Sequence, residues 1–579
     1  MAREPLPSRT AAAMPTTPRN LVRWLFSHDS GPRNRFVPRW FVLRALAAIY
    51  FSAFLALVYQ IRGLIGPDGI LPAQHYLDLV SRSFPGLARF WYAPSLFWIS
   101  SGSGWMMAVT WIGLAASVAA FFDLWPRLSF FLCLVCFLSF VACGSDFANY
   151  QSDGMLLEAG FIALFFVPRG LWPGLGLDSP PPRAALFLLQ WEWFRIYFES
   201  GLVKLLSGDP EWRHLTAMDH YYQNGPLPTW IGYYIQHLPH WFQLASAGGT
   251  LVMELGIVWM LFLPRRLRLI CFFIVTPWEI GVILTANYAF LNYLVFVLGF
   301  LLLDDRSVRW LVPARFRKSL DAIPQPEPEL SAEPSLSILS ASAGPSEPSG
   351  GAPPLSSPPL GRQSGPIRGL RAHLAAVRLA IVAVLLLWIA YDTTAELVTI
   401  PWPDFPLLTA PVTALEPFRI ANRYGLFAVM TRGRYEIEFQ GSNDNQSWTP
   451  YPFCHKPQAL DQAPGIYAPY QPRFDWNLWF ASLTDWQQAD IVPLTEEALL
   501  HGNPAVLSLF CGNPFPSAPP KYIRAVLWQY WFTSLEDKKL TGAWWQRQYV
   551  GLYAPVLTLE PNGKYGVLEW PIPLPPQHD

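Results

Sequence analysis

The sequence contains nine apolar runs of the kind that form membrane-spanning helices. The first run covers residues 41–60, and the others are centred near Ile112, Phe137, Ile162, Gln190, Leu255, Phe273, Val297 and Leu385. A helix of about 20 apolar residues spans the hydrocarbon core of a bilayer and pairs all of its own backbone polar groups. The sequence therefore predicts a polytopic α-helical membrane protein with about nine spans.

Basic residues alternate between the two sides that these spans define. Arginines precede the first run and recur at Arg127, Arg169, Arg183, 265–268, Arg306 and Arg309. The intervening loops 144–154 and 287–290 contain no lysine or arginine, and the loop 207–240 contains only Arg213. Because cytosolic loops carry the excess of Lys and Arg, we expect a cytosolic N-terminus and C-terminal residues on the other side.

These patterns divide the chain into five predicted parts. They are a cytosolic tail (1–38), a multi-span domain (39–303), a cytosolic linker (304–372), a last transmembrane helix (373–392) and an outward-facing soluble domain (393–579). Proline, serine, glycine and alanine dominate residues 323–366. Such a composition cannot bury a core, so we expect this linker to be disordered and assign it no function.

The soluble part begins with a strand pattern. Residues 434–440 alternate polar and apolar side chains, 441–447 form a turn cluster, and a return strand starts at Trp448. This hairpin resembles those of jelly-roll, discoidin-like modules. We read 527–540 and 543–549 as amphipathic helical or interfacial pieces. The prediction is a C-terminal α+β domain with a β-sandwich-like part.

Ionisable side chains lie inside the apolar runs. The set is Glu158, Glu192, Arg195, Glu199, Lys204, Glu254 and Glu279. An unpaired charge near a bilayer centre costs about 3 kcal/mol or more, so such groups pair or face water. The spacings 192/195 and 195/199 place two carboxylates beside one guanidinium on a helix face, and we expect Arg195 to pair with both.

Two hypotheses follow for this polar intramembrane cluster. One is an internal ion-pair network that locks helices together, and the other is a polar site with Lys204 as its leftover cation. Five acids face only two bases, so some carboxyl groups should be protonated or hydrated. That imbalance favours a solvated cavity.

Cysteines and histidines add little evidence of chemistry. Cys133, Cys136, Cys143 and Cys271 lie in apolar runs, where packing is their usual role. Cys454 and Cys511 are the only cysteines of the soluble domain, and the sequence leaves open whether they pair. The histidines His214, His220, His237 and His240 flank the outer loop, and the spacing 214/220 fits no standard helical ligand pair, so we interpret them as loop histidines at an interface rather than a metal site.

The composition narrows the function classes further. The formal net charge is zero and only 14% of the residues are charged, so we expect no nucleic-acid partner. The sequence contains no phosphate-binding GKS/T loop, paired CxxC knuckle, HExxH or GxSxG. We therefore assign no catalytic, cofactor-binding or metal-binding residue.

Five long segments resemble the lipase maturation factor family. They are YQSDGMLLEAGF (150–161), WFRIYFESGLVKLLSGDPEWRHLTAMDHYYQNGPLP (193–228), ANYAFLNYL (286–294), NRYGLFAVMTRGRYEIEFQGSNDNQSW (422–448) and APYQPRFDWNLWFASL (468–483). The resemblance implies a protein of the endoplasmic reticulum membrane that helps secreted lipases, or other exported clients, to reach their active form. It establishes no catalytic residue. Candidate outer-loop residues in the second segment are Trp212, Arg213, His220 and Tyr221.

A shorter match supports an alternative function. The residues GLVKL (201–205) followed by Trp212 are similar to a segment of the vitamin K-dependent carboxylase family, in which a lysine at the matching place is implicated in chemistry. The alternative is a membrane enzyme that uses a polar site around Lys204. A transporter is disfavoured because no repeated pair of broken helices is seen.

The compartment stays open at this stage. The sequence ends in PPQHD, without a KDEL-type signal. The family resemblance implies the endoplasmic reticulum, whereas a bacterial source would place the protein in the inner or plasma membrane.

Overall fold

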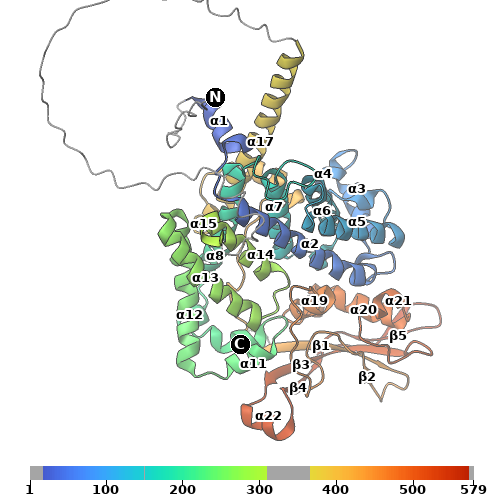
Figure 1. Ribbon diagram of the computed structural model, residues 1–579. Coiled ribbons are helices and arrows are strands. Elements are labelled where there is room, and N and C mark those ends of the chain that lie inside the picture. The colour runs from blue at the N-terminus through green and yellow to red at the C-terminus, as the bar shows by residue number, and fades with distance from the viewer. Residues whose placement is uncertain (1–16, 149, 310–365, 573–579) are drawn as a thin grey trace, which may run out of the picture.

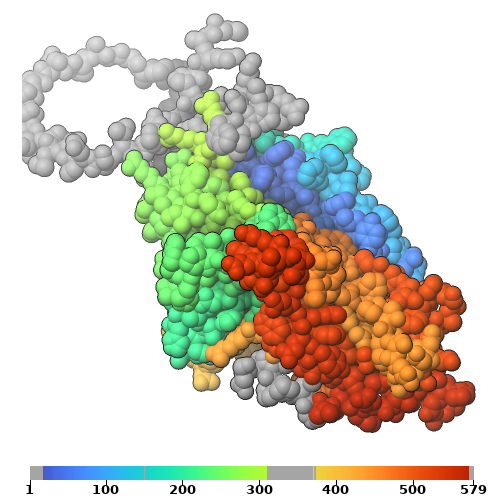
Figure 2. Space-filling view, turned by 90° about the horizontal axis from the view of Figure 1, so that it is seen from below, coloured from blue at the N-terminus to red at the C-terminus, as the bar shows by residue number. Residues whose placement is uncertain are grey.

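The computed structural model describes residues 17–148, 150–309 and 366–572, in three layers (Figure 1). A bundle of long helices forms the first layer, a few short helices the second and an antiparallel sheet the third. Seen from below, the C-terminal residues spread across the ends of the bundle helices (Figure 2). Residues 310–365, which hold most of the predicted linker, lie outside the described residues.

The bundle is built from the helices of residues 18–308 together with α17. The long helices are α2 (Phe36–Ile65), α5 (Ser103–Phe121), α6 (Pro126–Val141), α7 (Gln151–Phe166), α8 (Arg183–Leu206), α12 (His240–Leu255), α13 (Arg265–Thr285) and α17 (Pro366–Thr399). The shorter helices are α1 (Pro18–Phe26), α3 (Ala73–Ser83), α4 (Ala88–Tyr92), α9 (Pro210–Arg213), α10 (Met218–Asn224), α11 (Trp230–Gln236), α14 (Leu291–Gly299), α15 (Asp305–Val308) and α18 (Thr409–Leu415). Two 3₁₀ turns follow α12 and α14: η4 (Ile257–Phe262) and η5 (Phe300–Leu302).

Five of the described helices are long and apolar enough to cross a membrane: α2, α5, α12 with η4, α13 and α17. A membrane-spanning helical protein is thus confirmed, whereas the expected number of nine spans is not. All nine apolar runs do lie on helices, but α6, α7 and α14 have 16, 16 and 9 residues, fewer than the about 20 that span a bilayer. Helix α8 has 24 residues and is broken as an apolar run by its charged side chains.

The sheet contains β1 (Arg434–Ser442), β2 (Thr449–Pro450), β3 (Tyr522–Phe532), β4 (Trp545–Leu552), β5 (Val556–Leu559) and β6 (Tyr565–Glu569). The strand order is β2-β1-β3-β5-β6, and β4 pairs with β3 beside β5. The β1–β3 register places Arg434 opposite Tyr530 and Ser442 opposite Tyr522. The predicted hairpin at 434–448 is confirmed as β1 and β2.

Two expectations for the soluble domain need correction. The piece at 527–540 is strand up to Phe532 and helix from Leu535, and the piece at 543–549 is mostly strand. Large aromatic side chains pack across β3 and β4, as in the Trp528–Tyr549 and Phe532–Trp545 pairs. Only α22 (Leu535–Thr541) is helical there. All the described strands belong to one sheet, so no second sheet completes a sandwich.

Helices take the place of that second sheet. Helices α19 (Arg473–Ala481), α20 (Ile491–Leu500) and α21 (Pro504–Leu507) lie between the sheet and the bundle (Figure 1). The Ser482 hydroxyl donates to Tyr435 O on β1 at 3.0 Å, and the Tyr553 hydroxyl donates to Ala481 O at 2.6 Å. On the bundle side, a Cβ at Gly63 of α2 would lie 2.5 Å from Ala505 O, so only glycine allows this approach of α21.

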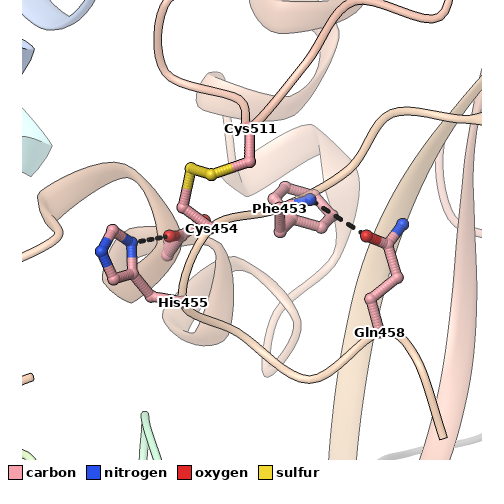
Figure 3. Close-up of a disulfide and its surroundings, with 6 residues drawn as sticks. Phe453, Cys454, His455, Gln458 and Cys511 are labelled. Carbon is pink, nitrogen blue, oxygen red and sulfur yellow. Dashed lines mark hydrogen bonds and ion pairs between the residues drawn. A yellow bond between two sulfur atoms is a disulfide. The ribbon is translucent and has the colours of Figure 1, made fainter. Parts of the chain in front are cut away.

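Cys454 and Cys511 form a disulfide, with Cα atoms 5.1 Å apart (Figure 3). The bond joins the chain after β2 to the chain after α21, where Cys511 N also donates to Pro452 O at 2.8 Å. Beside it, His455 Nδ1 lies 2.7 Å from Asp475 Oδ2. The remaining four cysteines are free and buried. The pairing that the sequence left open is therefore present.

The disulfide should stabilise the soluble domain. Its sequence separation is 57 residues, and a native bond typically contributes about 2–4 kcal/mol. We expect the double variant Cys454→Ser/Cys511→Ser to melt at a lower temperature than the wild type in detergent solution. A reductant should lower the melting temperature of the wild type and leave the double variant unchanged. An equal response of both proteins would contradict the assignment.

Candidate functional site

The guanidinium of Arg195 on α8 lies between two carboxylates inside the bundle. Its Nη2 contacts Glu158 Oε1 on α7, and its Nη1 lies 3.5 Å from Glu199 Oε1, one turn along α8. All three side chains are at most 1% exposed. This arrangement agrees with the hypothesis of an ion-pair network between helices.

Glu192 is not part of that network. Both of its carboxylate oxygens are buried and lack a hydrogen-bond partner in the described part of the chain. The expected pairing of Glu192 with Arg195 is therefore wrong. The reason is geometric: Glu158 approaches the guanidinium from the neighbouring helix and replaces the carboxylate one turn back.

The network also binds backbone from the C-terminal half of the chain. We call residues 419–433, which connect α18 to β1, the docking segment. Asn422 N donates to Glu158 Oε2 at 3.1 Å, Tyr424 N donates to Glu199 Oε2 at 2.6 Å, and Arg195 Nη1 donates to Asn422 O at 2.6 Å. The buried charges thus provide acceptors and a donor for main-chain groups that would otherwise be unpaired.

A glycine allows this close approach. The Asn422 side chain donates from Nδ2 to Gly154 O on α7 at 2.9 Å. A Cβ at Gly154 would lie 2.4 Å from Asn422 Oδ1 and 2.7 Å from its Cγ. Any larger residue at position 154 would displace the docking segment.

The loop between α8 and α11 holds the other end of the docking segment. Trp212 Nε1 donates to Phe427 O at 2.8 Å, and Asp209 Oδ2 accepts from Met430 N at 2.6 Å. Further hydrogen bonds join Asn224 to Thr431 O (2.7 Å) and Arg432 to Glu211 (3.0 Å). The segment is therefore bound along its length by the bundle and its loop.

Glu211 is held in its charged form. Burial alone would raise the pKa of this carboxyl, but the Thr216 hydroxyl and the nearby His220 and Arg432 together lower it below its usual value. His220 Nε2 lies 3.9 Å from Glu211 Oε2. A charged Glu211 keeps the ion pair to the docking segment intact at neutral pH.

Lys204 is fully paired. Its Nζ donates to both oxygens of Glu254 on α12, at 2.6 and 2.8 Å, and to Ser200 Oγ at 2.7 Å. The ammonium also lies 5.1 Å from the centre of the Trp212 ring. An ammonium has three donors. The hypothesis of Lys204 as a leftover cation is therefore wrong, because α12 supplies a carboxylate that spacing along one helix cannot reveal.

A cavity of about 500 Å³ lies beside this ion pair. Of the predicted residues, Lys204, Glu254, Glu279, Trp212 and Tyr221 line it. Glu279 on α13 accepts a hydrogen bond from the Tyr197 hydroxyl at 2.6 Å. The docking segment contributes the wall residues Tyr424, Leu426 and Phe427.

The predicted cluster is therefore two sites. Glu158, Arg195 and Glu199 bind the docking segment, and Lys204, Glu254 and Glu279 face the cavity. Of the outer-loop candidates, Arg213 is exposed and neither it nor His220 lines the cavity.

A second junction was missed by the sequence reasoning. Arg473 on α19 forms a bidentate pair with Asp153 at the start of α7, at 2.7 and 2.8 Å, with both side chains fully buried. Arg473 N also donates to Gln60 Oε1 on α2 at 2.7 Å. Asp153 and Arg473 lie in two of the segments that carry the family resemblance (150–161 and 468–483), and this was the only indication of the pair in the sequence.

No group of three or more His, Cys, Asp or Glu side chains that could hold a metal ion occurs in residues 17–148, 150–309 and 366–572. The loop histidines have other contacts. His237 Nε2 lies 2.9 Å from Thr533 O, and His240 Nδ1 lies 3.1 Å from Asp219 Oδ1.

Comparison with known proteins covers both halves of the chain. A family described as the lipase maturation factor transmembrane domain matches residues 37–310, and one described as the lipase maturation factor C-terminal domain matches residues 420–555. Lipase maturation factor 2 of Gallus gallus is 33% identical, with 90% of this chain and 81% of the relative covered. Lipase maturation factor 1 of Mus musculus is 29% identical, over 93% and 91% of the two chains. No solved structure matches the chain significantly.

The Lys204–Glu254 pair can be tested by a double-mutant cycle. Removing one member of a buried ion pair costs about 3–5 kcal/mol, because the remaining charge is left unpaired. We expect Lys204→Met to lower the melting temperature strongly, and Lys204→Met/Glu254→Leu to regain most of the loss. The exposed Lys539 provides the control variant Lys539→Met, which should change little. A double variant no more stable than Lys204→Met would refute the pairing.

Proposed function

The chain belongs to the lipase maturation factor family, and we propose on that premise that it is a membrane-embedded maturation factor for secreted lipases. The role is that of a chaperone: it assists the folding and assembly of a client without turning over a substrate. The observation that carries the proposal is the match over both the membrane part and the C-terminal domain, which the docking segment joins.

We place the C-terminal domain on the side of the membrane where exported chains emerge. The three loops that are poor in lysine and arginine (144–154, 207–240 and 287–290) all contact this domain. The contacts are Asp153 with Arg473 (2.7 Å), Tyr233 with Thr533 O (3.0 Å) and Asn287 with Tyr467 N (2.8 Å). A common partner for these loops supports one common side, as the charge rule predicts.

Arginines gather at the other end of the bundle. Their guanidinium groups donate to backbone carbonyls: Arg35 to Leu301 (2.9 Å), Arg39 to Leu175 (2.8 Å) and Arg268 to Leu302 (2.9 Å). The carbonyls of Leu301 and Leu302 lie at the C-terminal end of α14 and η5, where cations are favoured. The separation of the two ends supports a cytosolic N-terminus and a cytosolic linker at 304–372.

The endoplasmic reticulum membrane is the compartment we propose. Lipase maturation factors of vertebrates are the relatives that cover most of this chain. The Cys454–Cys511 disulfide requires an oxidising compartment on the side of the C-terminal domain. The lumen of the endoplasmic reticulum is such an oxidising compartment, and it is the compartment that the family resemblance implies.

The surface offered to clients is the free end of the sheet. The aromatic stretch 475–480 is mostly buried in the domain core, with Trp476 and Trp479 each 8% exposed. In contrast, Leu568 on β6 and the following Trp570 and Ile572 are 50%, 62% and 80% exposed. Apolar side chains on an edge strand suit contact with an unfolded chain.

The enzymatic alternative gains no support from the geometry. A lysine that acts as a base or nucleophile directs its nitrogen toward a substrate position. The Lys204 ammonium instead directs its three donors to Glu254 and Ser200. We therefore do not propose carboxylase chemistry.

Co-expression with a secreted lipase tests the proposed function. In cells that lack their own maturation factor, we expect this chain to raise lipase activity per unit of secreted lipase protein. Gly154→Leu should abolish the gain, because its side chain would displace Asn422 and release the docking segment. The effect is expected on activity even where the variant is inserted in the membrane in normal amounts.

The matched control is Gly104→Leu. Gly104 also lies on a bundle helix, α5, and a Cβ there meets no atom within 4 Å. This variant should support the lipase as well as the wild type does. Unchanged specific activity across a panel of secreted lipases, with and without the wild-type chain, would refute the maturation role.

A further inference from the structure

Helices α12 and α13 form an outer wall of the bundle that faces the membrane. Both are candidate spans, and only 33% and 22% of their most apolar windows are buried. They lie at one side of the bundle, connected by η4 (Figure 1). The cavity of about 500 Å³ lies behind them, and α8, α9, α10, α11, α14 and the docking segment form its other walls.

The cavity reaches the lipid-facing surface through α12. Ala245 and Gly249, one turn apart on this helix, both line the cavity and are both exposed. Gly281 lines it from α13, and a Cβ added at Gly249 or Gly281 meets nothing within 4 Å. Small residues on the two helices thus leave an opening at membrane depth.

Two residues that line the cavity each have a buried polar atom without a hydrogen-bond partner in the described part of the chain. Glu279 is 3% exposed, and its Oε1 has no hydrogen-bond partner among the residues that the structure describes. The same holds for the buried Asn292 Nδ2 on α14. Unpaired buried polar atoms are costly and rare, so two of them in side chains that line one cavity favour a ligand.

We propose that this cavity binds one neutral long-chain lipid with a hydroxyl head group, of the monoacylglycerol class, which enters from the bilayer between α12 and α13. The size is within the range of small-molecule sites, about 300–1,000 Å³. The lining is mostly apolar with a few polar groups on one side, which fits an acyl chain and a small polar head.

The head group follows from the charges already present. Lys204 is the one lysine or arginine among the lining residues and is already paired with Glu254, so an anionic head group would enter without a counter-ion. A hydroxyl can accept a hydrogen bond from Asn292 Nδ2 and donate one to Glu279 Oε1. One such group satisfies both unused atoms and adds no charge.

A lipid bound in this cavity would also contact the docking segment. Tyr424 binds Glu199 through its backbone and lines the cavity with its side chain. Leu426 and Phe427 complete that wall. A lipid in the cavity therefore packs directly against the segment that attaches the C-terminal domain.

Photolabelling of the full chain in phosphatidylcholine nanodiscs tests the proposal. The probe is a monoacylglycerol analogue with a diazirine in its acyl chain. We expect labelled peptides from α12, α13 and the docking segment, and competition by unlabelled monoolein. Gly281→Leu and Gly249→Leu, which fill the opening, should each reduce this labelling by about tenfold, as loss of a specific site would.

Gly104→Leu serves as the matched control and should label like the wild type. Melting curves of all three variants establish that each is folded, and either cavity variant suffices for the comparison. Labelling spread evenly over the lipid-facing helices, or unaffected by both cavity variants, would overturn the site. Equal competition by oleate or lysophosphatidylcholine would overturn the neutral head group.

The readout does not involve a lipase. Lipid labelling that persists while the maturation assay fails would leave this site standing without the proposed function. The reverse result would remove the lipid site alone.

Discussion

The pairing of Arg195 with Glu158 and Glu199 is the interaction on which the two halves of the molecule depend. The three charged side chains are at most 1% exposed inside the bundle, where an unpaired charge would be destabilising. They satisfy one another and then use their remaining atoms on the backbone of Asn422 and Tyr424. The buried charges thus provide the hydrogen bonds that allow the backbone of the docking segment to pack inside an apolar bundle.

The position of the docking segment also shapes the cavity. The docking segment forms one wall, and the Lys204–Glu254 pair holds α8 against α12 at another. The Asp153–Arg473 pair fixes α19 to the start of α7 independently. The two junctions attach the C-terminal domain to the bundle at separate places.

The sequence predicted the local features and missed the distant ones. Apolar runs located the helices, a period of two located β1, and the two cysteines of the soluble domain proved to pair. The buried charges were recognised as unusual and the Arg195–Glu199 pair was predicted, but their distant partners were not. Glu158 and Glu199 bind backbone N–H groups more than 220 residues away, and every residue type except proline carries such a group.

Lys204 and β3 show the same limit in two other ways. The partner of Lys204 lies 50 residues along the chain on another helix, so spacing within α8 left the lysine unpaired. Strand β3 has buried residues on both faces, with Ala525, Val526 and Leu527 buried in succession, and this interrupts the alternation that marks a half-buried strand. In each case the missing information was which surface would be covered by another part of the fold.

Hydrogen exchange of the docking segment tests the central claim most directly. If the buried charges bind this segment, the amides of Asn422 and Tyr424 should exchange as slowly as those of the bundle helices, although no regular secondary structure protects them. In Arg195→Met, where Glu158 and Glu199 lose their shared cation, the same two amides should exchange much faster, while β1 and β3 stay protected. Rapid exchange of both amides in the wild-type protein, at the rate of an exposed loop, would contradict the account.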